Sequence, residues 1–176
     1  SGKSYVAKKF GYPIFNADEE VARLYRKDKK IFKKLQKILP NYIFSFPINK
    51  KEISEAILSQ NSNLKKIVKI VHLEIRKKLR KFLIKNKNSR IVVLDIPLLL
   101  ENKINKKNDT LIFIDAKKTN ILKKLKKRKN FNLDILNKFK KIQLPLVYKK
   151  NNSRFVIKNK FTKKSVKDEI KKILKV

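Results

Sequence analysis

The first four residues, Ser1-Gly2-Lys3-Ser4, have the types and spacing needed to hold a chain of phosphates. They match the closing half of the phosphate-binding loop G-x-x-x-x-G-K-[ST], whose backbone N–H groups bind phosphate oxygens. In such a loop Lys3 contacts the β- and γ-phosphates of a nucleotide, and the Ser4 hydroxyl is a ligand of Mg²⁺. The chain starts inside the motif, so we expect the parent protein to carry a preceding strand and the first glycine.

The residues after Ser4 test this interpretation, because a Gly-Lys-Ser tripeptide arises easily by chance in a chain rich in Lys and Ser. Val6, Ala7 and Phe10 have the spacing of one helix face, and Gly11 follows where a helix would end. The loop therefore opens a helix, as the motif requires.

Two carboxylates follow predicted strands. Asp18 comes after the apolar segment 12–16, and Asp95 ends the run Ile91-Val92-Val93-Leu94. Ligands bind at strand ends in open α/β sheets. We therefore expect Asp18 to be either a catalytic carboxylate or the N-cap of a helix beginning at Glu19. We expect the Asp95 carboxylate either to lie near Mg²⁺ or merely to end a strand.

Strands and helices alternate along the chain, which predicts an α/β fold with a parallel sheet in a single domain over residues 1–176. Besides 12–16, strands are expected at 90–97, 111–115 and 155–157. One helical pattern runs from Glu19 to Pro40, and residues 42–48 form a loop. Further helices are expected near 53–58, 64–84, 119–129, 134–148 and 166–174, with a loop and short helix at 98–108.

The composition excludes several classes of protein. The chain has no Cys, which excludes a disulfide scaffold and thiolate metal sites, and its single histidine, His72, excludes a zinc site. No apolar run approaches the roughly 20 residues of a membrane span. We therefore expect a cytoplasmic protein with no membrane partner.

The net charge of +35 is the main argument for a nucleic-acid-binding protein. The excess is mostly Lys, it is spread along the chain, and it accompanies abundant Asn and Ile, as an AT-rich coding sequence would produce. Nucleic-acid-binding proteins more often have their positive charge on one face, and they contact bases with Arg or stacked aromatic rings. We expect no specific nucleic-acid partner, but this alternative stays open.

In order along the chain, the motifs resemble those of the dephospho-CoA kinase family, which adds the 3′-phosphate in the last step of coenzyme A synthesis. The family's G-S-G-K-S-T-V-A appears as Ser1-Gly2-Lys3-Ser4-Tyr5-Val6-Ala7, and its D-A-D appears as Asn16-Ala17-Asp18. Its I-D-R is matched loosely by Ile48-Asn49-Lys50, and its H-P by His72-Leu73.

The most specific motif of this resemblance is P-L-L-x-E after a buried strand, here Pro97-Leu98-Leu99-Leu100-Glu101. Further along, Asp115, the basic segment 124–128 and Gln143 resemble the family's next strand end, lid helix and later helix. The family's A-D-x-x-I strand appears as Ser153-Arg154-Phe155-Val156-Ile157. Asn16 and Arg154 each replace an aspartate of the family pattern.

The resemblance implies a three-layer P-loop kinase fold with a helical acceptor-binding insertion (19–88) and a lid (117–150), acting as a monomer on ATP, Mg²⁺ and dephospho-CoA. It also implies roles for individual residues. Catalysis would fall to Asp18, Lys3 and Arg128; ATP binding to Ser1, Gly2, Lys3, Ser4, Tyr5 and Arg128; acceptor binding to Asp18, His72, Pro97, Leu98 and Glu101; and Mg²⁺ to Ser4 and Asp95.

Two further interpretations stand beside this one. Another small-molecule P-loop kinase would share the loop but not P-L-L-x-E after a later strand. Alternatively, the chain as it stands lacks the central strand of its sheet, which would leave unpaired backbone groups, so that it folds poorly and binds ATP weakly.

Overall fold

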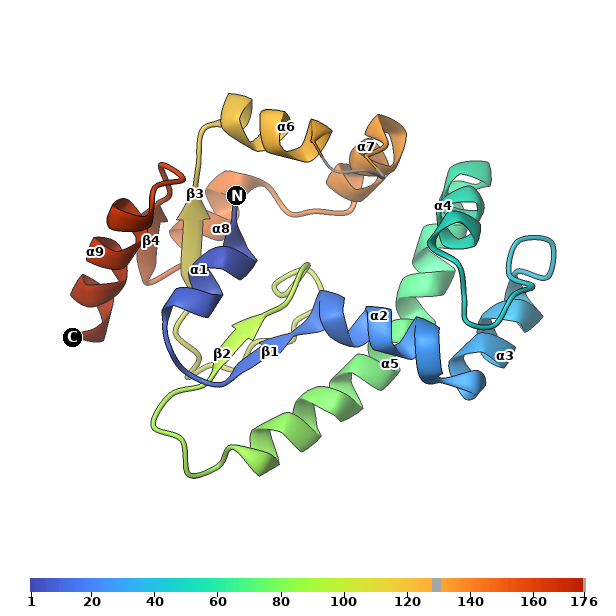
Figure 1. Ribbon diagram of the computed structural model, residues 1–176, viewed down its shortest axis with the longest axis horizontal. Coiled ribbons are helices and arrows are strands. Elements are labelled where there is room, and N and C mark those ends of the chain that lie inside the picture. Colours follow the sequence, from blue (N-terminus) through green and yellow to red (C-terminus); the bar gives the residue numbers. More distant parts are fainter. Residues whose placement is uncertain (128–130, 176) are drawn as a thin grey trace.

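The computed structural model describes residues 1–127 and 131–175 (Figure 1). Strands and helices alternate, as the sequence predicts. Strand β1 (Ile14–Asn16) pairs with β2 (Val93–Asp95), and β3 (Ile112–Asp115) pairs with β4 (Phe155–Lys158). Both pairs are parallel, and in the described part of the chain they form two separate two-stranded sheets.

The register of the first sheet brings two predicted site segments together. Asn16 of β1 lies opposite Asp95 of β2, so the two strands end at the same edge. Asp18 follows the end of β1 by two residues, and Pro97 follows the end of β2 by two.

Helix α1 (Lys3–Lys9) forms where the loop motif predicts it and packs against β1, β2 and α9 (Lys163–Leu174). A glycine lies next to each end of the helix. Gly2 has φ +81° and Gly11 has φ +76°, a backbone conformation that side chains with a Cβ disfavour. The buried residues Val6 and Ala7 hold α1 in place.

Helices α2 (Ala17–Lys27), α3 (Lys29–Ile38), α4 (Lys50–Ser59) and α5 (Asn61–Lys85) form one helical group, shown on the right in Figure 1. The prediction of one helix from Glu19 to Pro40 is wrong. Asp28 divides it, because its carboxylate accepts the N–H groups of Lys30 and Ile31 and so starts α3 as an N-cap.

Helices α6 (Lys118–Lys126), α7 (Leu133–Lys141) and α8 (Leu146–Asn151) lie between β3 and β4 in the chain. The predicted helix over 134–148 is divided, because α7 ends at Lys141 and α8 begins after its N-cap Pro145. Proline has no N–H and disfavours helical backbone in the residue before it, so a helix does not continue through this link. The short helix predicted within 98–108 is absent; this segment forms turns, with positive φ at Leu98 and Lys103.

The buried apolar residues form two clusters. The larger joins β1 to the helical group, and α5 contributes Leu64, Ile67, Val71, Ile75 and Leu79 to it. The smaller consists of Val6, Ile157, Val166 and Ile170, which lie where α1, β4 and α9 meet. Helix α1 therefore depends on the C-terminal part of the chain for its packing.

Gly2 is also fixed by a close approach. A Cβ on Gly2 would lie 2.5 Å from Asn159 Nδ2. Asn159 is buried; its Nδ2 donates to the Ser1 carbonyl at 2.9 Å, and its Oδ1 accepts the Phe161 N–H. This amide ties the start of the chain to the segment after β4.

We predict that Gly2→Ala lowers the free energy of unfolding more than Gly11→Ala does. Both variants place a side chain in left-handed backbone, at about 1–2 kcal/mol. Only at Gly2 does the new Cβ displace Asn159, which adds about 1–3 kcal/mol for its disturbed hydrogen bonds. A Cβ at Gly11 meets no atom within 4 Å.

Urea unfolding of the two variants against the parent chain measures this difference. Equal losses of stability would contradict the role of Asn159.

Candidate active site

The predicted ATP-binding residues Ser1 to Tyr5 form the start and first turn of α1. Gly2 is the N-cap, no side chain caps the helix, and its first turn contains no acidic residue. Lys3 is exposed. An uncapped helix N-terminus with a neighbouring cation favours negative charge, so the residues present fit a phosphate group.

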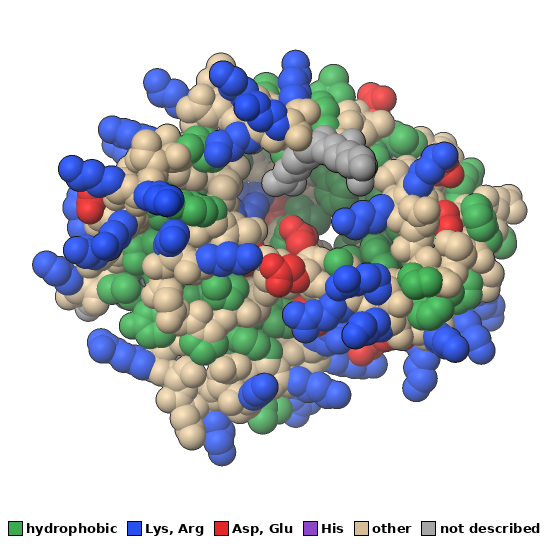
Figure 2. Space-filling view, viewed as in Figure 1, with side chains coloured by type: hydrophobic (Ala, Val, Ile, Leu, Met, Phe, Trp, Pro, Cys, Tyr) green, Lys and Arg blue, Asp and Glu red, His purple; other side chains and the backbone are tan. Residues whose placement is uncertain are grey.

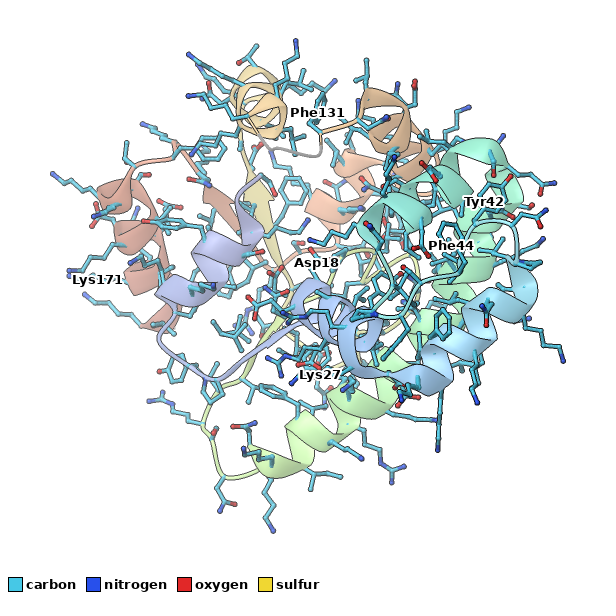
Figure 3. All side chains as sticks on the ribbon, turned by 45° about the vertical axis from the view of Figure 1, so that its right-hand side comes forward. Asp18, Lys27, Tyr42, Phe44, Phe131 and Lys171 are labelled. Atoms are coloured by element: carbon cyan, nitrogen blue, oxygen red, sulfur yellow. The ribbon has the colours of Figure 1, made fainter. Side chains whose placement is uncertain are left out.

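Asp18 lies in the first turn of α2 and is exposed. Figure 3 shows it near the middle of the molecule, at the start of that helix. The N-cap of α2 is Asn16, whose Oδ1 accepts the Glu19 N–H at 3.1 Å. The alternative prediction that Asp18 caps this helix is therefore wrong.

Asp95 ends β2 and is 7% exposed. Its carboxylate has no hydrogen-bond or ion-pair partner within residues 1–127 and 131–175. Among the described residues, Ser62 Oγ is the only fully buried side-chain oxygen or nitrogen without a hydrogen-bond partner, so the Asp95 carboxylate keeps contact with solvent. A carboxylate in that position suits a hard cation such as Mg²⁺.

A protein cage for the ion is absent from the described residues, because no three His, Asp or Glu side chains gather there as metal ligands. Mg²⁺ usually keeps several waters and binds one or two protein oxygens together with substrate phosphates. Ser4 and Asp95 carry oxygens of the kind that such a site uses, and the helix of the first packs against the strand of the second.

A pocket of about 530 Å³ lies between α5 and the turn that follows β2. Three of the predicted acceptor-binding residues, His72, Leu98 and Glu101, converge on it from these two segments. The end of α7 closes it through Ile142. Pro97 is the first residue of the turn, and neither it nor Asp18 lines the pocket.

Sequence reasoning missed the basic residues of this pocket. Lys65, Lys69 and Arg76 line it from the same face of α5 as His72. The Arg76 Nη2 donates to the Asn102 carbonyl at 2.8 Å and so fastens α5 to the turn. Their helical spacing from His72 could have indicated these residues. Lysines are so frequent in this chain, however, that spacing alone does not separate pocket lysines from surface lysines.

His72 is half-buried on α5. Burial lowers its pKa below the usual value, and the positive charge of Arg76 lowers it further. The imidazole is therefore neutral at neutral pH, where it can donate or accept a hydrogen bond.

Glu101 forms an ion pair with Lys149. The Lys149 Nζ lies 2.5 Å from Glu101 Oε1, which also accepts the Leu144 N–H at 3.0 Å. Burial by itself raises the pKa of Glu101, but the hydrogen bonds from Lys149 and from backbone N–H groups, with the charge of Lys149, lower it by more. The net pKa lies below the ordinary value, so the carboxylate is charged at neutral pH.

The lid residue Arg128 lies outside the described residues. Lys124, a second cation of the predicted lid, places its Nζ 4.6 Å from the centre of the Phe161 ring. Phe161 follows Asn159, so α6 contacts the segment that also holds the start of the chain.

The surface around the strand ends is unevenly charged. Figure 2 shows acidic side chains gathered in the hollowed middle of one face, with Lys and Arg side chains around them. In the part of the chain that the structure describes, no helix is both long and apolar enough to cross a membrane.

Curated proteins similar to this chain include dephospho-CoA kinases. A dephospho-CoA kinase of Wolbachia sp. subsp. Brugia malayi (strain TRS) is 34% identical over 178 residues, covering 98% of this chain and 91% of its own length. A dephospho-CoA kinase of Wolbachia pipientis wMel is 32% identical with the same coverage.

Solved structures agree in fold. A protein from Thermus thermophilus matches with a TM-score of 0.75 at 21% identity, covering 98% of this chain and 90% of that one. Dephospho-CoA kinase from Campylobacter jejuni matches with a TM-score of 0.60 at 21% identity, covering 97% and 87%. The family model for dephospho-CoA kinase matches residues 1–165, and the chain therefore belongs to the dephospho-CoA kinase family, whose members are ATP-dependent phosphotransferases.

Proposed function

We propose that the chain transfers the γ-phosphoryl group of ATP to the ribose 3′-hydroxyl of dephospho-CoA at the edge where β1 and β2 end. The observation that carries this proposal is the parallel register of the two strands, which sends Asp18 and the pocket-forming turn out from one edge. The pocket lined by His72, Leu98 and Glu101 would then hold the acceptor.

The transfer needs a group that takes the proton of the attacking hydroxyl. The hydroxyl oxygen bonds to the γ-phosphorus while the bond between that phosphorus and the β–γ bridging oxygen breaks, which releases ADP. Asp18 is the carboxylate we assign to accept the proton, because it is exposed at the strand edge and does not cap α2.

The triphosphate would lie against the first turn of α1. The backbone N–H groups of this turn and the Lys3 ammonium would hold its oxygens, and Tyr5 would border it. Ser4 and Asp95 would hold Mg²⁺, which neutralises charge on the phosphates when bound. Arg128 would approach them from the lid.

On this proposal, two segments of the chain have separate roles. Residues 19–88 form the acceptor-binding insertion and residues 117–150 form the lid. The enzyme would act as a cytoplasmic monomer with small-molecule partners.

The basic face of α5 suits one part of the acceptor in particular. Dephospho-CoA carries a diphosphate between its adenosine and its pantetheine arm. Lys65, Lys69 and Arg76 are cations along one wall of the pocket, whereas Val68 and Leu98 are apolar. We assign the diphosphate to the cations and the pantetheine arm to the apolar wall.

We predict that Asp18→Asn lowers kcat for CoA formation by about 10²–10⁴-fold, the usual contribution of a general base. ATP affinity should stay near that of the parent chain, because the amide keeps the size of the carboxylate. The assay follows CoA and ADP together.

Glu19→Gln is the matched control, since Glu19 is the next residue and its carboxylate is exposed. That carboxylate pairs with Lys8 and accepts a hydrogen bond from Asn16 Nδ2 at 3.4 Å, and a glutamine oxygen can also accept this hydrogen bond. It should keep most of the turnover. An Asp18→Asn variant as fast as the parent chain would exclude Asp18 as the base.

We predict that Lys69→Gln raises KM for dephospho-CoA roughly tenfold, as loss of one charge-assisted hydrogen bond would. KM for ATP should not change. Lys66→Gln is the control, because Lys66 is exposed on the same helix but does not line the pocket. If the two variants have equal KM values for dephospho-CoA, the assignment of the diphosphate to this wall of the pocket is wrong.

A further inference from the structure

Glu101 is held more firmly than a residue that only borders a pocket. Its side chain is 10% exposed and that of its partner Lys149 is 20% exposed. The pair Lys8–Glu19, in contrast, is more than half exposed on both sides. An ion pair shielded from water keeps more of its electrostatic attraction than one at the surface.

The two partners of Glu101 come from both sides of one connection. Leu144 lies in the short link between α7 and α8, and Lys149 lies in α8. A single carboxylate oxygen therefore fixes the point where the predicted lid returns toward the second sheet.

A second contact fixes the lid at its other side. The Lys138 Nζ of α7 donates to the Ile57 carbonyl at 2.7 Å and to the Leu58 carbonyl at 2.9 Å. These carbonyls lie in the last turn of α4, where a helix favours a cation. Helix α7 itself has no fully buried residue, and these polar contacts act together with the packing of Phe139 against the larger core cluster.

The carboxylate of Glu101 also borders the acceptor pocket, together with Ile142 just after α7. A molecule in the pocket would contact both the residue that holds the lid and the end of a lid helix. Occupation of the pocket and placement of the lid thus share one set of side chains.

We infer that Glu101 is a positioning residue that couples acceptor binding to the placement of helices α7 and α8 of the lid. The inference rests on the proposed function. Glu101 does not touch the transferred phosphoryl group; it keeps the link between α7 and α8 in place through Leu144 and Lys149. A misplaced lid admits water, and the γ-phosphoryl group then passes to water as inorganic phosphate instead of to the 3′-hydroxyl.

The test compares Glu101→Gln, Lys149→Met and the double variant in one assay that follows ADP, CoA and inorganic phosphate. Both single variants should lower kcat for CoA roughly 10- to 100-fold, since small displacements of positioning groups have effects up to about that size. Each should also form more than one ADP for each CoA. The double variant should be no worse than the single variants, because both remove the same contact.

Two further variants separate positioning from loss of fold. Lys149→Arg keeps the ion pair and should restore one ADP for each CoA. Lys172→Met removes a lysine that pairs with Glu169 on α9, far along the chain, and should leave both kcat and the ratio unchanged. A merely structural role would lower kcat with the folded fraction, measured by circular dichroism, and leave the ratio at one.

The outcomes distinguish the inference from the proposed function. If the parent chain forms CoA and both single variants keep the ratio of one, the role of Glu101 is wrong and the function stands. If the parent chain hydrolyses or binds ATP but forms no CoA, the acceptor is wrong and the inference falls with it.

Discussion

The parallel pairing of β1 with β2 is the contact on which the candidate site depends. Because Asn16 lies opposite Asp95, the chain leaves both strands at one edge and continues into α2 on one side and the pocket turn on the other. A slip of one residue would turn every side chain of the strand to the other face. Phe15 secures the arrangement, since its ring lies 5.6 Å from that of Phe82 on α5.

The site is built from segments that lie far apart in the sequence. Charged side chains join these segments by binding backbone groups of one another. Arg76 binds the Asn102 carbonyl, and Lys138 binds carbonyls of α4. Glu101 accepts a backbone N–H, as does the buried Glu52, which accepts those of Phe44 and Ser45. In a chain with 14 acidic residues against 49 basic ones, the carboxylates of Glu52 and Glu101 therefore each organise more than one group.

Periodicity predicted the strands and most helices because apolar spacing follows directly from burial. It missed the breaks at Asp28 and Pro145, since apolar residues keep their helical spacing on both sides and a local side chain or a missing N–H decides where the helix stops. The scarce residue types were informative for the site. His72, Leu98 and Glu101 converge on one pocket as the motifs suggest, whereas Lys65 and Lys69 could not be singled out among so many lysines.

The basic side chains around the acidic hollow affect the association rate of the substrates. Nucleotides and diphosphates are polyanions, and a net charge of +35 creates a long-range field that draws them toward the protein before any specific contact forms. Salt weakens such steering over a Debye length of about 8 Å at physiological ionic strength. The same field attracts RNA without regard to sequence, so in the cell this enzyme would compete for its small anionic substrates against a large excess of weakly held polymer.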